Sequence, residues 1–230
     1  MTETILTIMM PCLNEAETLG FCMHEAKQFI DESGIPAEIL VVDNGSLDES
    51  VHIAKDAGAR VVVEEKQGYG YAIRTGFMVA KGDYIIMGDC DGSYDFCNLM
   101  PYIEKLKAGY ALVVGNRLSS KMEKGAMPFL HRYIGVPGLS WIARKRFGID
   151  EVQDFHCGLR GVRKDAVQQF QFCTGGMEFA TEMIVEFANA KERICEVPIV
   201  FRRDRRSGRS HLRTFRDGWR HLKYILEKRV

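Results

Sequence analysis

Residues 84–95 read Tyr-Ile-Ile-Met-Gly-Asp-Cys-Asp-Gly-Ser-Tyr-Asp, an apolar run that leads directly into an acidic triplet. The run predicts a buried strand, and the triplet places Asp89 and Asp91 where that strand meets solvent. Two neighbouring carboxylates repel each other and lose hydration unless a cation or strong donors compensate. Mg²⁺ or Mn²⁺ prefers one or two carboxylates plus substrate phosphate oxygens. We therefore predict that Asp89 and Asp91 bind Mg²⁺ or Mn²⁺; an ordinary exposed turn is the alternative.

Outward from this strand, short apolar runs alternate with amphipathic stretches. We expect strands at Ile5–Met10, Ile39–Asp43, Arg60–Glu64, Tyr84–Met87 and Ala111–Val114. Helices are expected at Glu17–Asp31, Asp48–Ala57, Tyr71–Ala80 and Leu99–Lys107. This alternation predicts an α/β fold, a Rossmann-like, mostly parallel sheet with helices on both faces. Ligands bind such sheets at the carboxyl ends of the strands.

The second half of the chain is less regular. A polar loop over 116–127 precedes a helical stretch, Phe129–Phe147, that is interrupted near 135–138. Short strands within Val152–Val162, a helix at Met177–Ala190, an edge strand at Ile194–Phe201 and a final amphipathic helix at Phe215–Leu226 follow. Pro198 favours the edge position. We expect residues 1–200 to form the main domain, and 201–230 to be a basic loop and helix of the same domain.

Composition narrows the class of protein. The seven cysteines are odd in number and scattered, which favours reduced, cytosolic thiols. We expect neither a signal peptide nor a membrane-spanning segment, since no basic leader and no run of 18 apolar residues is present. Residues 201–230 hold eleven Lys and Arg against three acids, although the whole chain is neutral. A basic end on an acidic body suggests contact with phosphates on a substrate or a lipid surface, with a solvated helix face as the alternative.

Three loops at the expected binding edge each allow a structural and a functional interpretation. Asn14 with Glu17, and Ser46 with Glu49, spell capping boxes at helix starts, and Asp95 is expected to cap the helix that follows it. Asp43 ends an apolar strand, where its carboxylate could accept hydrogen bonds from a base or ribose.

The glycines Gly68 and Gly70 are not a dinucleotide fingerprint, because the sixth position is Ile73 and the segment follows the third strand. They mark either a plain turn or a backbone approach to phosphate.

Together these segments resemble the family 2 glycosyltransferases of GT-A fold, and most closely the dolichyl-phosphate mannose and glucose synthase-like branch. The resemblance covers roughly residues 4–200 and rests on the order of the motifs PCLNE, VVDNGSLD, GYGYAIRTGF, GDCDGSYDF, VVGNRL, DFHCGLRG and GMEFATEM. It implies a hexosyltransferase that moves a sugar from a GDP- or UDP-sugar with inversion, using Mg²⁺ or Mn²⁺. Cys90 is a modest departure, since many members have Ala there.

The resemblance also implies roles for single residues. Pro11, Asn14 and Glu15 match the loop that holds the nucleotide, and Asp43 matches the carboxylate that recognises the base. Asp89 and Asp91 match the D-x-D pair, with Asp91 the surer ligand, and Arg117 matches a basic residue that faces phosphate. Asp154, Gly158 and Arg160 match the segment near the sugar and the acceptor.

The acceptor decides whether the reaction needs a base. A hydroxyl acceptor needs a carboxylate to take its proton, and Asp154 is then the candidate. A phosphate monoester, with a second pKa of about 6, is already largely ionised and needs cations instead. The basic loop supplies Arg202 and Arg206 among five arginines able to fold over phosphates. We therefore expect a polyprenyl phosphate acceptor; a soluble or glycan hydroxyl acceptor is the alternative.

The final helix has an apolar and a basic face, which suits an anionic membrane surface; packing on the core or on a second copy is the alternative. This favours a cytoplasmic protein on the cytoplasmic face of a membrane, without a nucleic acid partner and with a homo-oligomer possible.

Glu178 and Glu182 are assigned to a helix surface or to sugar contact, His156 to a structural or polar contact, and His131 and Arg132 to possible phosphate contact. A sugar-nucleotide nucleotidyltransferase is disfavoured because Pro11–Glu15 is not a Gly-rich basic loop. A non-catalytic binding module is the third hypothesis.

Overall fold

The computed structural model describes residues 5–119, 122–207 and 214–228. Within them a single seven-stranded sheet has the order β3-β2-β1-β4-β6-β5-β7. The strands are β1 Leu6–Cys12, β2 Ala37–Asp43, β3 Arg60–Val63, β4 Tyr84–Met87, β5 Leu112–Asn116, β6 Arg160–Arg163 and β7 Ile194–Pro198. All pairings are parallel except those of β6, which runs antiparallel to both β4 and β5. The predicted mostly parallel α/β sheet is confirmed.

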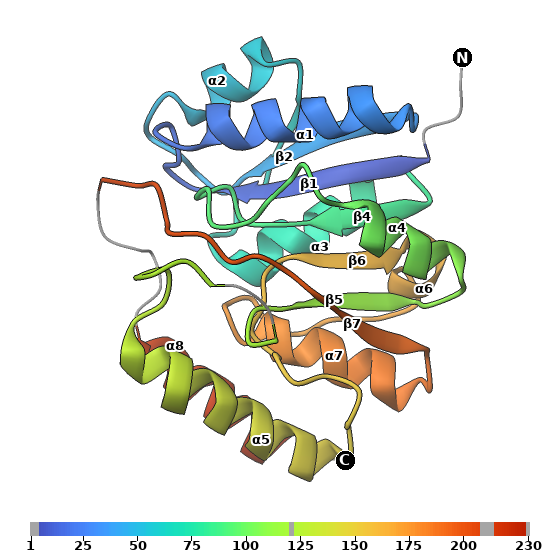
Figure 1. The fold of residues 1–230 in the computed structure, drawn as a ribbon, viewed down its shortest axis with the longest axis vertical. Coiled ribbons are helices and arrows are strands. Elements are labelled where there is room, and N and C mark those ends of the chain that lie inside the picture. The colour runs from blue at the N-terminus through green and yellow to red at the C-terminus, as the bar shows by residue number, and fades with distance from the viewer. Residues whose placement is uncertain (1–4, 120–121, 208–213, 229–230) are drawn as a thin grey trace.

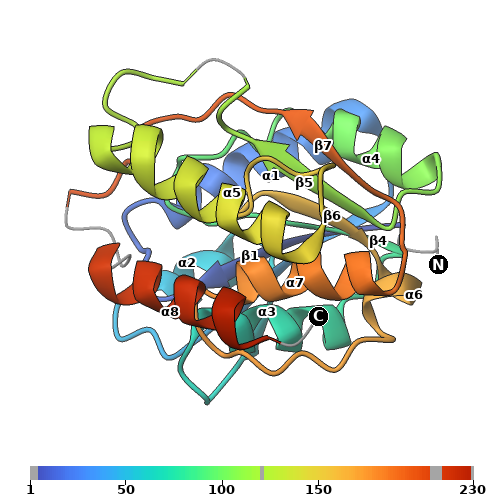
Figure 2. The same ribbon diagram turned by 90° about the horizontal axis from the view of Figure 1, so that it is seen from below.

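Helices cover both faces of the sheet (Figures 1 and 2). They are α1 Leu19–Ser33, α2 Ser50–Asp56, α3 Tyr69–Val79, α4 Met100–Lys107, the π-helical turn η1 His131–Gly135, α5 Val136–Phe147, α6 Lys164–Val167, α7 Phe179–Asn189 and α8 Thr214–Glu227. Figure 2 shows α1 and α4 on one face and α3 and α7 on the other, with α5 and α8 packed against each other outside these layers. The long parallel strands β1 and β2 are buried on both sides, as their unbroken apolar runs require.

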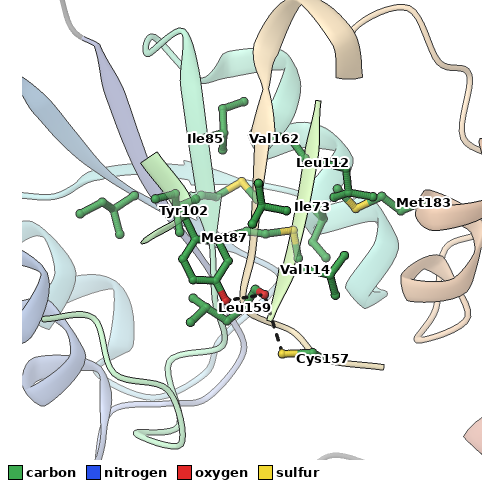
Figure 3. Close-up of a cluster of buried hydrophobic side chains, with 14 of the residues drawn as sticks. Ile73, Ile85, Met87, Tyr102, Leu112, Val114, Cys157, Leu159, Val162 and Met183 are labelled. Atoms are coloured by element: carbon green, nitrogen blue, oxygen red, sulfur yellow. Dashed lines mark hydrogen bonds between the residues drawn. The ribbon is translucent and has the colours of Figure 1, made fainter. Parts of the chain in front are cut away.

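The core is continuous across the antiparallel strand β6. In Figure 3, Tyr102 of α4 lies on one side of the strands, and Ile73 of α3 and Met183 of α7 lie on the other. All three side chains are fully buried or nearly so. The Tyr102 hydroxyl donates to the carbonyl of Leu159 at 3.3 Å, and the Cys157 thiol to the same carbonyl at 3.7 Å, so both polar side chains of this cluster are satisfied. This packing fixes the start of β6, and with it the loop 154–158 that precedes the strand.

Short strands were expected within Val152–Val162, and the structure has one strand there, β6, which begins only at Arg160. The amides of the preceding loop bond to side chains instead of to a neighbouring strand. That of Phe155 donates to Ser140 Oγ at 3.2 Å, and that of Gly158 to the Tyr94 hydroxyl at 2.7 Å. Side chains thus accept the hydrogen bonds from backbone amides that a neighbouring strand would accept in a sheet. The β7 strand is an edge strand, as Pro198 predicted.

Both predicted capping boxes are wrong. The helices α1 and α2 begin later than expected, at Leu19 and Ser50, and neither has a side-chain cap. Asn14 and Ser46 bond to each other's loop instead. The amide of Asn14 donates to Ser46 Oγ at 2.9 Å, and Asn14 Oδ1 accepts from the amide of Leu47 at 2.7 Å. These bonds tie the loop after β1 to the loop after β2.

Asp95 does not cap α4 either, since that helix has Leu99 at its N-cap position. Its carboxylate accepts from the amide of Cys97 at 3.0 Å and pairs with Arg202.

Candidate active site

A cavity of about 910 Å³ opens at the carboxyl ends of the parallel strands. Residues that directly follow β2, β4 and β5 line it, as do the last residues of β1. Of the predicted site residues, the lining includes Pro11, Glu15, Gly68, Asp89, Asp91, Arg117 and Arg206. The other six, all within the described part of the chain, lie outside the lining: Asn14, Asp43, Gly70, Asp154, Arg160 and Arg202. The cavity therefore brings together seven of the thirteen residues and leaves six outside its lining.

One corner of the cavity gathers three carboxylates, which we call the acidic corner: Glu15, Asp89 and Asp91. Parallel pairing brings them together, because Met9 of β1 is in register with Met87 of β4 and the acids follow both strands. Burial raises the pKa of Asp89 to about 6, and the neighbouring Asp91 adds to this effect. Burial likewise raises the pKa of Glu15 to about 7, against the opposing effect of Arg206. The corner therefore carries negative charge at a free-energy cost.

Arg206 lies within this corner and acts as its cation. Its Nη1 donates to Glu15 Oε1 at 2.9 Å and its Nη2 to Asp91 Oδ2 at 3.1 Å. Asp204, two residues earlier, accepts from Arg206 Nε at 2.9 Å. These carboxylates outweigh burial and raise the pKa of Arg206. A positive group between carboxylates of separate loops shows that the corner suits a cation, and its all-oxygen donors fit Mg²⁺ or Mn²⁺.

The predicted catalytic residue Asp154 has a different role in this structure. It is fully buried and forms a two-pronged ion pair with Arg117, with Nε–Oδ2 at 2.7 Å and Nη2–Oδ1 at 2.8 Å. Burial works to raise the pKa of Asp154, but Arg117 and backbone amides outweigh it and lower the pKa. With its oxygens engaged and outside the cavity lining, Asp154 is not placed to take a proton from an acceptor. It positions Arg117, whose side chain does line the cavity.

Arg160 and Arg202 were predicted to contact ligand, and the structure places both elsewhere. Arg160 is buried and donates to three backbone carbonyls, those of Phe155, Cys157 and Ala180, at 2.7–2.8 Å. It thereby ties the loop 154–158 to α7. Arg202 pairs with Glu25 at 2.6 Å and with Asp95 at 2.9 Å, on the side of α1 and α4. The sequence does not show which groups, brought close by folding, will accept hydrogen bonds from an arginine.

The two glycines at the start of α3 have a packing role. A Cβ on Gly68 would collide with the carbonyl oxygen of Gly175, and one on Gly70 would lie 2.6 Å from that of Thr174. Their amides are also used, since Gly68 donates to Asn44 Oδ1 at 2.7 Å and Gly70 to the Gly175 carbonyl at 3.1 Å. The close approach of two loops, rather than a free phosphate cradle, thus accounts for glycine here.

Of the other residues expected near the ligands, some line the cavity and others only shape the loops around it. Pro11 lines the cavity, and its carbonyl accepts from the Cys90 thiol at 3.3 Å. Asp43 is buried and accepts from the amides of Gly45 and Ser46, so it shapes its own turn. Gly158, from the acceptor-side motif, lies against the Asp89 carboxylate, where a Cβ would collide with it.

The cavity lining also contains residues of α8, a helix whose basic face was expected on a membrane surface. Arg216, Arg220 and His221 of α8 line the cavity, together with Asp217 and with His131 and His156. The spacing of Arg216 and Arg220 on one helical face was the available signal, but it was interpreted as a membrane-facing surface. Arg220 is held by Glu178 at 2.7 Å. The basic face of α8 therefore points at least partly into the cavity.

Two of the lining histidines, His156 and His221, contact each other. The rings of His156 and His221 meet edge to face, with centroids 4.5 Å apart, and His221 Nδ1 lies 2.9 Å from the Thr181 hydroxyl. Burial lowers the pKa of His221 to about 4 and also lowers that of His156. Both ring nitrogens of His156 are buried without a hydrogen-bond partner. The pair is therefore neutral at physiological pH.

Glu182 is not a surface residue, contrary to one of the two expectations for it. It is almost fully buried, and its carboxylate accepts from the amides of Cys173 and Thr174 at 2.7 and 2.9 Å. It holds the loop that packs against Gly68 and Gly70. Arg132 lies over the ring of Tyr133 at 5.3 Å and is not part of the cavity lining.

Comparison with known proteins agrees with this architecture. The profile of the family described as Glycosyl transferase family 2 matches residues 7–170. Low-salt glycan biosynthesis hexosyltransferase Agl6 of Haloferax volcanii is 38% identical over 223 residues, which are 96% of this chain and 53% of Agl6. The dolichyl-phosphate hexose transferase of the same organism is 29% identical over 213 residues, 93% of this chain and 89% of that protein. This chain thus spans about half the length of Agl6.

Among solved structures, glucosyl-3-phosphoglycerate synthase from Mycobacterium tuberculosis is similar in fold. A crystal structure of it with Mn²⁺, uridine diphosphate and glucosyl-3-phosphoglycerate has a TM-score of 0.76 and 19% sequence identity, covering 97% of this chain and 79% of that one. This likeness confirms the predicted GT-A type of fold.

The Arg117–Asp154 pair gives a stability prediction. Asp154→Asn leaves a buried guanidinium without its counter-ion and should lower the free energy of unfolding by about 3–5 kcal/mol. Because the pKa of Asp154 is lowered on folding, the wild-type advantage should be present at neutral pH and be lost as the pH falls through that lowered pKa. Urea unfolding at several pH values measures this. Asp150→Asn, which removes an exposed partner of Arg144, is the control and should change little.

The raised pKa of Asp89 gives a prediction of opposite sign. An acid whose pKa is raised to about 6 on folding is ionised at a cost above that pH, and carries no such cost below its unfolded pKa. Asp89→Asn should therefore raise the free energy of unfolding by about 1–3 kcal/mol at pH 8 and have little effect near pH 4. Denaturant unfolding at both pH values, beside the exposed Asp31→Asn, tests it. Equal stability of Asp89→Asn and wild type at pH 8 would refute the electrostatic strain.

Proposed function

The chain belongs to glycosyl transferase family 2, and from that premise we propose that it is a metal-dependent, inverting hexosyltransferase. Its donor is a GDP- or UDP-sugar and its acceptor is a polyprenyl phosphate. Support comes from the dolichyl-phosphate hexose transferase that it resembles over most of both chains. The observation that carries the proposal is the make-up of one cavity, whose lining holds the acidic corner with Arg206 and Arg117 and also Arg216 and Arg220 of α8.

At the donor end, Asp89 and Asp91 are the proposed ligands of Mg²⁺ or Mn²⁺, the ions with which the structurally similar synthase is crystallised together with uridine diphosphate. Bound there, the metal would neutralise the charge of the departing nucleoside diphosphate. Pro11 would border the base, and Asn44 would hold the neighbouring loop, since it bonds to the carbonyls of Glu64 and Lys66. Arg117, already oriented by Asp154, faces the same space and would stabilise phosphate charge.

At the acceptor end, the geometry favours a nucleophile that needs no base. Asp154, the base candidate for a hydroxyl acceptor, is held in its ion pair with Arg117. Arg216 and Arg220 line the cavity together with Asp217. A phosphate monoester is largely ionised at neutral pH, so arginines can position it for attack on the anomeric carbon without proton removal. The neutral His156 and His221 suit a polar but uncharged contact to the sugar.

A lipid acceptor implies contact with a membrane surface, and the structure offers one beside the cavity. No helix in residues 5–119, 122–207 and 214–228 is long and apolar enough to cross a bilayer. We define the aromatic face as Phe129, Tyr133, Ile134 and Trp141, which are 74%, 57%, 61% and 60% exposed. Tyr133 and Ile134 lie in η1 and Trp141 lies in α5, which continues directly from η1. Exposed aromatic groups on a helix are typical of membrane-surface binding.

The aromatic face adjoins the cavity and basic side chains. His131, Val136 and Leu139 of the same helical segment line the cavity, so one wall separates the cavity from the aromatic face. Lys145 and Arg146, exposed in the last turn of α5, add positive charge suited to anionic lipids.

The membrane contact had been expected on the last helix. In the structure Ile225 of α8 is fully buried while Trp219 is 64% exposed. The apolar side of α8 is therefore partly used in packing, and η1–α5 becomes the main proposed membrane surface.

The transfer reaction itself can be measured. Purified protein with labelled GDP- or UDP-sugars and Mn²⁺ should label extracted polyprenyl phosphate, and should label soluble sugars or phosphoglycerate far less. Asp91→Asn should lose at least about 100-fold of this activity while keeping its fold, because the metal ligand is gone. Asp31→Asn should behave as wild type. Transfer to a soluble hydroxyl acceptor with no labelled lipid would favour the alternative acceptor class.

Membrane docking has its own measurement. Trp141→Ser and Phe129→Ser should each weaken sedimentation with anionic vesicles by about 10-fold, since each removes an aromatic anchor. Binding should also fall at high salt. Met78→Ser is the matched control, because Met78 is 72% exposed on α3, away from the cavity wall. Equal loss in the Met78 variant would show that the aromatic face is not the docking surface.

A further inference from the structure

Residues 202–207, which we call the strap, follow Phe201 and cross the acidic corner. In Figure 1 this segment runs from the end of β7 across the strands toward the loops after β1 and β4. Its backbone follows the D-x-D segment, since the amide of Arg202 donates to the Ser93 carbonyl at 2.9 Å and that of Arg205 to the Asp91 carbonyl at 3.0 Å. The amide of Ser207 donates to Glu17 Oε2 at 2.7 Å. The strap is thus anchored on both sides of the corner.

The position of Arg206 on the strap conflicts with a metal at the same carboxylates. Its Nη2 already takes Asp91 Oδ2, an oxygen that a metal would need, and its Nη1 takes Glu15. Two unit positive charges about 4 Å apart repel by roughly 4 kcal/mol at an effective dielectric constant of 20, and a divalent ion repels more strongly. A metal and the guanidinium therefore cannot both occupy this geometry at low cost.

The arriving donor also supplies what Arg206 would lose. A nucleoside diphosphate brings several negative oxygens into the corner, and guanidinium groups pair with phosphate oxygens in two-pronged geometry. Asp204 accepts from both Nε and Nη2 of Arg206, and Glu15 accepts from Nη1, so these contacts can persist while the Nη2 hydrogen bond to Asp91 is exchanged for one to phosphate. Exchange of the Asp91 carboxylate for a phosphate oxygen keeps Arg206 paired, and the metal would then neutralise Asp91.

We propose that Arg206 is an exchangeable internal cation, a positioning residue that neutralises the acidic corner before the donor arrives and is displaced from Asp91 onto the diphosphate when metal and donor bind. This inference rests on the proposed metal and nucleotide-sugar chemistry. It adds that the strap couples the two ligands. Metal alone must compete with Arg206, whereas metal with nucleotide gives Arg206 a new partner.

The test measures binding rather than turnover. Mn²⁺ is titrated by electron paramagnetic resonance into wild type, Arg206→Gln and Arg206→Lys, with and without uridine or guanosine diphosphate. Without nucleotide, Arg206→Gln should bind Mn²⁺ at least about 10-fold more tightly than wild type, because a charge-assisted competitor is removed. With Mn²⁺ present, the same variant should bind nucleoside diphosphate about 10-fold more weakly. Arg206→Lys keeps the positive charge but loses the two-pronged guanidinium. Its affinities for Mn²⁺ and for nucleoside diphosphate should lie between those of wild type and Arg206→Gln.

Arg203→Gln is the matched control. It removes the same charge from the same strap, but Arg203 is exposed and outside the cavity lining, so both affinities should stay near wild type. Circular dichroism identifies any variant that fails to fold, and Arg206→Lys then carries the comparison. A wild type that binds Mn²⁺ only with nucleotide, beside an Arg206→Gln protein that binds it alone, supports the proposal.

The outcomes separate this inference from the function on which it rests. If wild type binds Mn²⁺ and nucleotide but Arg206→Gln binds Mn²⁺ no more tightly than Arg203→Gln, the exchange is refuted and the proposed donor chemistry stands. If neither wild type nor any variant binds metal or nucleotide, both are refuted.

Discussion

The repulsion between the carboxylates of the acidic corner is the physical constraint on which the rest of the site depends. Glu15 and Asp91 reach the same place because β1 and β4 are parallel neighbours whose loops leave on the same edge. Their repulsion and lost hydration have to be offset by a positive group. In this structure that group is Arg206, held by contacts of 2.9 and 3.1 Å. The strap, the cavity and the proposed metal chemistry all follow from the need to balance that charge.

The buried arginines show how one residue type supports a site in different ways. Arg117 is fixed by a carboxylate and lines the cavity. Arg160 donates hydrogen bonds to three backbone carbonyls and fixes the loop beside the cavity. Arg206 links carboxylates from separate loops. The first and third are suited to phosphate contact because part of each faces the cavity, whereas the second is structural because its partners are internal.

Much of the fold followed from periodicity. The strand at Tyr84–Met87 was predicted with its observed bounds, and the other strands of the first half were placed within a few residues. The resemblance to family 2 glycosyltransferases singled out Glu15, Asp89, Asp91 and Arg117, and all four line the cavity. Predictions failed where side chains replace backbone pairing, as in the loop 154–158, or where two distant loops bond to each other, as Asn14 and Ser46 do. Such contacts join residues far apart in sequence, so local patterns carry no sign of them.

The sequence by itself determined the alternation of strands and helices, the family, and the placing of Asp89 and Asp91 at a binding edge, because these depend on local order and on the parallel topology that it implies. Only the tertiary structure decided that Asp154 pairs with Arg117, that Arg160 is internal, and that α8 turns arginines toward the cavity. The physical reason is that the role of a charged side chain depends on the group with which it pairs. Partners 37 residues apart, as for Arg117 and Asp154, or 115 apart, as for Arg206 and Asp91, are chosen by packing.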